Sequence, residues 1–365
     1  MGKITLYSLL LLIGLVSSQL LPQGGEEWLK WATMFCLSFI MIHVGYEFEI
    51  DKSQIKQYGW DYVVAGTAAT LPWLFCAAYF VWVLDMNSWN EALLLARFSS
   101  PTSAGVLFSM LAAAGLTATW VFRKIRVLAI FDDLDTILLM IPLKIMIVGM
   151  RWQLAVIAPV MVVLLWLAWR YLHSWKLPTE WPWLLLYAGV ITGVCEGIHL
   201  SSKIIDDVVP IDFEVLLPAF VFGCLLAHSK KKYVHSSDED YAQTIISAMF
   251  MILVGLSMPL IPYADVDWKV LSWNVLLITI LSNIGKMFPL FCYKKDASLQ
   301  ERFALSIGMF PRGEVGAGVL VVSIGYGLGG ITLTVAVLSL ALNLLLTGVF
   351  IMAVKKLSVK TQLYP

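Results

Sequence analysis

The chain has 365 residues, of which 59% are hydrophobic and 14% charged, and its 25 basic and 25 acidic side chains give a formal net charge of zero. That hydrophobic fraction lies above the range of soluble domains, and a balanced charge offers no basic surface for nucleic acid. The composition therefore excludes a soluble globular protein and indicates a membrane protein. Because no linker or charge block divides the chain, residues 1–365 are predicted to form a single transmembrane domain without a soluble regulatory domain.

Apolar segments long enough to cross a bilayer follow one another along the whole chain. A helix needs about 20 such residues to cross an apolar core of about 30 Å. The first segment, MGKITLYSLLLLIGLVSSQ, also has the pattern of a cleavable signal peptide. The hydropathy predicts an all-α membrane protein with about 12 transmembrane helices, near residues 4–21, 27–49, 58–84, 91–115, 119–149, 152–172, 181–200, 211–228, 241–262, 270–292, 303–325 and 329–354.

Basic residues alternate between the predicted loops. Loops on the cytoplasmic side of a membrane are rich in Lys and Arg. If the N-terminus is cytoplasmic, that side holds Lys3, Lys52, Lys56, Arg123, Lys124, Arg126, Arg170, Lys176, Lys230, Lys231, Lys232, Lys294, Lys295, Arg302, Lys355, Lys356 and Lys360. The opposite side holds Lys30, Arg151, Lys203 and Lys269. This asymmetry supports twelve spans with both termini in the cytoplasm.

Proline interrupts the fourth predicted span at Pro101, in ARFSSPTSAGVLFSMLAAAG, where Thr102 and Ser103 follow it. The eleventh span, LSIGMFPRGEVGAGVLVVSIGYG, is interrupted in the same way at Pro311. Proline lacks an amide donor and clashes with the preceding turn, so both helices should break or kink and expose backbone polar groups. Two interrupted spans in corresponding positions predict an inverted-repeat transporter with its site near the bilayer midplane. A packing kink is the alternative for either helix alone.

Three aspartates lie in the apolar fifth span, in IFDDLDTILLM. On a helix Asp132 and Asp135 share a face, whereas Asp133 is turned by about 100°. An ionised carboxylate in a low-dielectric interior must be paired, reach water or take up a proton. A carboxyl group that holds either a proton or a monovalent cation is the minimal device for exchange. The alternative is that these acids are solvated at the cytoplasmic end of the span, beside the basic residues at 123–126.

Lys286, in LSNIGKMFPLF of the tenth span, is a buried positive charge that requires an acid, and we expect Asp132 to be its partner. Snorkelling towards the cytoplasm is the alternative. Such a pair suits a switch, because protonation of the acid releases the lysine. The other basic residues inside the predicted spans are Arg97, Lys144 and Arg312.

Other charged residues of the spans have less defined roles. Arg312 and Glu314, in PRGEV, either pair to hold the interrupted helix, which we favour, or line a cytoplasmic funnel and sense pH. Glu196 and His199 fall near the outer end of the seventh span, where exposure to interfacial water explains them. Lys144 either compensates Asp135 from a distance or lies near the outer interface.

These segments resemble a known family. LAIFDDLDTILLMIPL is similar to the paired-aspartate span of bacterial sodium/proton antiporters in the monovalent cation/proton antiporter superfamily. GMFPRGEVGAGVLVVSIG, SSPTSAGVLFSMLAAAGL and FIMIHVGYEFEID resemble the two interrupted helices and an early acidic helix end. The resemblance covers most of the chain. It implies the inverted-repeat antiporter fold, with two crossing interrupted helices, a core bundle and a dimerisation bundle.

The resemblance also implies a function. The expected activity is secondary exchange of sodium or lithium for protons by alternating access, and it is electrogenic, with two protons exchanged for each ion. The expected protein is a homodimer in the bacterial inner membrane that contributes to pH and sodium homeostasis. It needs no cofactor. Asp133 would carry the proton and transiently bind the cation, Asp132 would partner Lys286, and Thr102 or Ser103 would contribute at the broken helix. Electroneutral relatives typically have Asn before the essential Asp. Asp135 stands where the family has a small or apolar residue, which leaves the stoichiometry open.

Three other activities fit parts of the sequence. A potassium/proton antiporter is the nearest alternative, because oxygen ligands alone do not separate the two ions. A cation channel is the alternative from another class of transport, and it would conduct without an opposing proton movement. An intramembrane aspartyl protease needs acids on two different helices, whereas all three aspartates share one helix here, so an enzyme is not expected.

Overall fold

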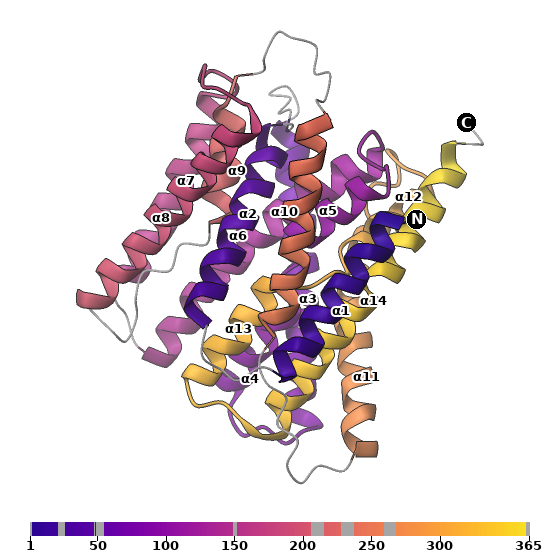
Figure 1. Cartoon of the computed structure of the whole chain (residues 1–365). Helices are drawn as coiled ribbons and strands as arrows, with labels where there is room; N and C mark the ends of the chain where they lie inside the picture. The colour runs from indigo at the N-terminus through magenta and orange to yellow at the C-terminus, as the bar shows by residue number, and fades with distance from the viewer. Residues whose placement is uncertain are drawn as a thin grey trace. The chain divides into compact units, whose positions relative to one another are not determined.

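The computed structural model in Figure 1 describes residues 2–20, 26–46, 48, 55–148, 152–205, 215–227, 237–258 and 268–362. Within these residues, each predicted span overlaps a helix or a pair of helices separated by a break. Five helical segments in the described part are long and apolar enough to cross a membrane: Trp28–Tyr46, Lys56–Trp82, Trp181–Ile205, Trp268–Phe291 and Gly330–Ser358. The described part of this membrane protein is thus all-helical.

The described residues form two compact units. Unit 1 contains α1 (Gly2–Leu20), α3 (Ile55–Trp82), α4 (Trp89–Ala96), η2 (Arg97–Ser99), α5 (Ala104–Ala113), most of α6 (Trp120–Val148), α11 (Trp268–Gly285), η3 (Phe288–Phe291), α12 (Leu299–Gly308), α13 (Glu314–Gly325) and α14 (Gly330–Gln362). Unit 2 contains α2 (Glu26–Tyr46), α7 (Trp152–Arg170), α8 (Trp181–Ile205), α9 (Leu216–Leu225) and most of α10 (Ser237–Leu256).

Unit 1 is built around α14, which packs against α1, α11 and α12. Figure 1 shows α1, in indigo, running alongside α14, in yellow. Close packing also joins α11 to α3, since a Cβ atom on Gly285 would lie 2.4 Å from the backbone nitrogen of Pro72. Only a residue without a side chain fits there, as is common where membrane helices meet. This contact fixes the end of α11 immediately before Lys286.

In unit 2, α2 packs against α8 and α9. Lys30 Nζ on α2 lies 3.3 Å from Glu196 Oε2 on α8, and Glu196 is 6% exposed. The expectation that interfacial water explains Glu196 is therefore wrong. The carboxylate of Glu196 is buried, and its negative charge is compensated by Lys30 on the neighbouring helix.

A buried ion pair away from the three aspartates ties α3 to α6. Lys124 Nζ donates to both carboxylate oxygens of Asp61 at 2.9 Å, and the Tyr293 hydroxyl donates to Asp61 Oδ1 at 2.6 Å. All three side chains are buried, so Lys124 is not a solvated loop residue as its predicted position suggested. Burial, and then the charge of Asp61, raise the pKa of Tyr293 above its usual range, so this hydroxyl keeps its proton at physiological pH.

We expect Asp61→Asn to lower the free energy of unfolding by about 3–5 kcal/mol, because removing one partner leaves the Lys124 ammonium group buried without its counter-charge. The measurement is the unfolding midpoint of purified protein in detergent. The double change Asp61→Leu with Lys124→Met should recover most of the loss, since an apolar pair of similar volume replaces both charges. An unchanged midpoint in Asp61→Asn alone would contradict the assignment.

Candidate functional site

The fourth and eleventh predicted spans are both broken near their prolines. Between α4 and α5 the chain passes through the 3-10 turn η2 and the non-helical segment 100–103, and between α12 and α13 it is non-helical over 309–313. Serine caps explain where α5 and α12 begin. Ser103 Oγ accepts from the Val106 amide, and Ser298 forms a capping box with Glu301.

The two breaks lie against each other. The Ser103 amide donates to the Pro311 carbonyl at 2.9 Å, and the Thr102 hydroxyl donates to the Met309 carbonyl at 3.1 Å. The approach is close enough that a Cβ atom on Gly313 would lie 2.8 Å from Ser103 Oγ. Backbone groups that a continuous helix would have paired internally are therefore gathered at one point of unit 1.

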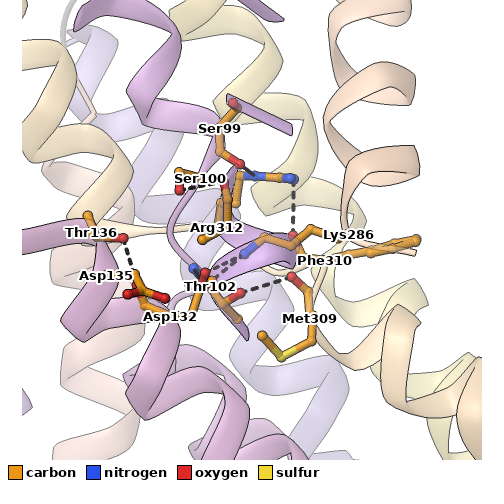
Figure 2. A network of polar contacts seen from close by, with 12 residues as sticks. Ser99, Ser100, Thr102, Asp132, Asp135, Thr136, Lys286, Met309, Phe310 and Arg312 are labelled. Atoms are coloured by element: carbon orange, nitrogen blue, oxygen red, sulfur yellow. Dashed lines mark hydrogen bonds and ion pairs between the residues drawn. The ribbon is translucent and has the colours of Figure 1, made fainter. Parts of the chain in front are cut away.

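Asp132 lies at this point (Figure 2). Its Oδ2 accepts from the Thr102 amide at 2.7 Å, and Lys286 Nζ donates to Oδ1 at 2.9 Å and to Oδ2 at 2.8 Å. Asp132 and Lys286 are both 0% exposed, so neither is solvated at a membrane surface and Lys286 does not snorkel. Asp132, Lys286 and the break at Pro101, which the sequence analysis assigned to one site, thus lie together in the structure.

Asp133 is 1% exposed and follows Asp132 on α6, turned from it as the helical period requires. It lies close enough to Lys286 for the two charges to interact. The alternative in which the aspartates are solvated at the end of the span is wrong, because Asp135 is also only 5% exposed. All three carboxyl groups are inside unit 1.

Arg312 binds both breaks. Its Nε donates to the Ser99 carbonyl at 2.8 Å, and its Nη2 donates to the Ser282 carbonyl at 2.9 Å. Its Nη1 donates to Asn283 Oδ1 at 2.8 Å and to the Phe310 carbonyl at 3.2 Å. With the residue 0% exposed, this geometry is that of a clamp rather than of a funnel lining. The side chains of Glu314 and Lys144, for which the sequence suggested pairings, lie outside the described part of the structure.

Arg97 is a member of the site that the sequence did not assign to it. It is 0% exposed, and its guanidinium lies 4.8 Å from the centre of the Trp73 ring. Its Nη1 donates to Ser100 Oγ at 2.9 Å and its Nη2 to the Asp135 carbonyl at 2.9 Å. The signal available in the sequence was an arginine four residues before the proline of a broken membrane helix.

The buried charges of the site balance. Three acids and three bases are each at most 5% exposed, namely Asp132, Asp133, Asp135, Arg97, Lys286 and Arg312. If all six are ionised, their charges sum to zero, which limits the cost of burying them. Removing or adding one charge, by a proton or by a cation, then changes the electrostatics of the whole cluster. Such an arrangement can couple the occupancy of one carboxyl group to its neighbours.

A family model described as "Sodium/hydrogen exchanger, transmembrane" matches residues 1–356. The chain belongs to the sodium/hydrogen exchanger family. As a member of it, the protein is a multi-pass cation/proton antiporter and not an enzyme, so the family expected from the paired-aspartate and interrupted segments is confirmed at this level.

The structure of this exchanger is similar to that of the sodium proton antiporter MjNhaP1 from Methanocaldococcus jannaschii. The TM-score is 0.61 at 16% sequence identity, over 94% of this chain and 91% of the other. At that identity the likeness establishes the fold alone. None of the curated protein sequences matched this chain.

Proposed function

We propose that this exchanger moves sodium or lithium against protons through Asp133, with a net charge carried in each cycle. The observation that carries the proposal is the position of Asp132, which is bound by Lys286 and by the Thr102 amide where the two broken helices meet. We assign the adjacent Asp133, which is 1% exposed on the same helix, as the carboxyl group that alternates between a proton and a cation. Backbone carbonyls at the two breaks are a further source of oxygen ligands in this proposal.

In this proposal Lys286 supplies the second proton of an electrogenic cycle. Lys286 Nζ lies 2.8 Å from Asp132 Oδ2, and any change at Asp132 that weakens this pair releases the lysine. Cation binding and proton binding then compete for one group of charges. Two protons exchanged for one monovalent cation move one net charge across the membrane.

The rest of the proposal concerns assembly. Unit 1 contains both broken helices and all six buried charges, so we assign it as the core bundle that changes its access between the two sides. Unit 2 is assigned as the dimerisation bundle of a homodimer. The alternation of basic loops supports an orientation with both termini in the cytoplasm of a bacterial cell, in the inner membrane.

A proteoliposome assay tests the function. We expect added sodium or lithium, but not potassium, to drive proton movement in the opposite direction, reported by a pH-sensitive dye in the lumen. Imposed voltage should shift the equilibrium sodium gradient by about tenfold for each 60 mV, because one net charge crosses per cycle. Equal responses to potassium would favour the potassium/proton alternative, and ion flux without opposing proton movement would favour a channel.

Lys286→Ala belongs to the same assay. Because this variant lacks the second proton carrier, its exchange should lose most of its voltage dependence and change its pH profile while the protein still inserts. A wild-type pH profile together with a wild-type response to voltage would remove Lys286 from the cycle without affecting the assignment of the family.

A further inference from the structure

A hollow of about 330 Å³ lies on the surface of α3 and is lined by Tyr62, Val63, Gly66, Thr67, Thr70 and Leu71. All six residues belong to unit 1, in the helix that packs beside the aspartate span. Tyr62 contacts Phe131 of α6 edge to face, with ring centres 5.6 Å apart. The hollow therefore opens at the side of α3 that adjoins α6.

Asp135 reaches this hollow through the gap at Gly66. A Cβ atom on Gly66 would lie only 2.8 Å from Asp135 Oδ2, so the carboxylate occupies the space of the missing side chain. This oxygen is buried and accepts no hydrogen bond from any described residue. A buried carboxylate oxygen without a protein donor is costly unless a cation, a proton or water satisfies it.

Other oxygens of the hollow are suited to a cation. The Thr70 hydroxyl donates its proton to the Gly66 carbonyl at 2.7 Å, and the Thr67 hydroxyl donates to the Val63 carbonyl at 2.8 Å. With these protons engaged, the threonine oxygens offer only lone pairs. The Tyr62 phenol is within interaction distance of the Asp135 carboxylate. One carboxylate and several neutral oxygens are a typical ligand set for hard cations.

Charges on three elements act on the Asp135 carboxylate. Asp132 lies one turn away on α6, Arg97 donates to the Asp135 carbonyl from η2, and Lys286 lies beyond Asp132. The donors of Arg97 that have partners bind Ser100 and this backbone carbonyl rather than the carboxylate. The carboxylate is thus stabilised by nearby positive charge while its Oδ2 remains open to a ligand from the hollow.

We propose that this hollow is an access site, in which Asp135 and the oxygens of Tyr62, Thr67 and Thr70 hold the transported monovalent cation before it reaches Asp133. The proposal rests on the proposed function and adds a second binding position for the same cation. It gives a role to an aspartate that the resemblance to paired-aspartate antiporters does not explain. Asp132, on the same face of α6, provides the next negative charge on the way from the hollow to the broken helices.

The test is the sodium dependence of exchange in proteoliposomes, with KM and kcat measured separately. Asp135→Asn should raise the KM for sodium about tenfold, as loss of one charged ligand implies, and this effect should exceed any change in kcat. A mutation that raises KM alone has removed binding rather than a step of turnover. Asp296→Asn, which removes an exposed carboxylate from a loop, should change neither quantity.

A second pair of variants keeps the proposal testable if Asp135→Asn does not fold. Gly66→Ala places a methyl group against Asp135 Oδ2 and should also raise the KM for sodium, whereas Gly59→Ala, on the same helix with nothing within 4 Å, should not. A wild-type KM in both Asp135→Asn and Gly66→Ala overturns the access site, whether or not the pH profile moves. If Asp135 only compensates Arg97, the amount of folded protein falls while KM stays constant, which also overturns it.

The two proposals fail in different ways. If the wild-type protein shows no sodium-coupled proton movement, the proposed function is wrong and the access site falls with it. If the wild type exchanges sodium for protons and the variants keep its KM, only the access site is wrong.

Discussion

Asp133→Asn should abolish sodium-driven proton movement in proteoliposomes, reducing it to the level of protein-free vesicles. Asparagine has nearly the same shape as aspartate but neither binds a proton nor carries the negative charge that holds a cation. Asp133 is 1% exposed and is one of six buried charges that sum to zero, so its neutralisation leaves a net positive charge in the site. We therefore expect the variant to fold with an unfolding midpoint somewhat below that of the wild type, while exchange is lost completely.

The control for this variant is Asp85→Asn. Asp85 is exposed in the turn after α3 and has a φ of 53°, a conformation that asparagine also adopts readily. This variant loses one carboxylate outside the site and should exchange at the wild-type rate. Sodium-driven proton movement that survives in Asp133→Asn would remove Asp133 as the carrier and transfer that role to Asp132 or Asp135.

Local patterns in the sequence predicted the helices and the breaks because the relevant forces act within one or two turns. Proline alone was not sufficient, since Pro72 and Pro142 lie inside the continuous helices α3 and α6. Pro101 and Pro311 differ in having partners for the backbone groups that a break exposes. Whether a proline ends a membrane helix thus depends on its neighbours in space as well as on its own geometry.

The pairing of Lys286 with Asp132 was predicted from the cost of a lone buried charge, across 154 positions of sequence. The same reasoning did not locate the partners of Arg97 or Arg312, because Arg312 binds mainly backbone carbonyls, and Arg97 binds one backbone carbonyl and one serine hydroxyl. It also missed Asn283, whose amide oxygen accepts from Arg312. The need for charge balance makes it possible to predict an acidic partner from the sequence. A neutral acceptor can be identified only from the folded structure.

The second large effect is expected at Arg312. Arg312→Met should lower the free energy of unfolding by about 3–5 kcal/mol and abolish exchange. The substitution leaves the carbonyls of Ser99, Ser282 and Phe310 without their donor, and it leaves the buried charges of the site with a net negative sum. Both changes act where the broken helices meet, so the positions of Asp132 and Asp133 should be lost together with stability. The measurements are the unfolding midpoint in detergent and sodium-driven proton movement.

Arg312→Lys separates geometry from charge at the same position. A lysine retains the positive charge, but its compact ammonium group cannot reach the four acceptors that the planar guanidinium group of Arg312 binds. This variant should therefore also be destabilised and poorly active. Arg123→Met, at an exposed position near the start of α6, is the matched control and should behave as the wild type. If Arg312→Met instead kept the stability of the wild type and shifted only the pH profile of exchange, the structural role of Arg312 at the broken helices would be wrong. Arg312 would then act as a pH sensor.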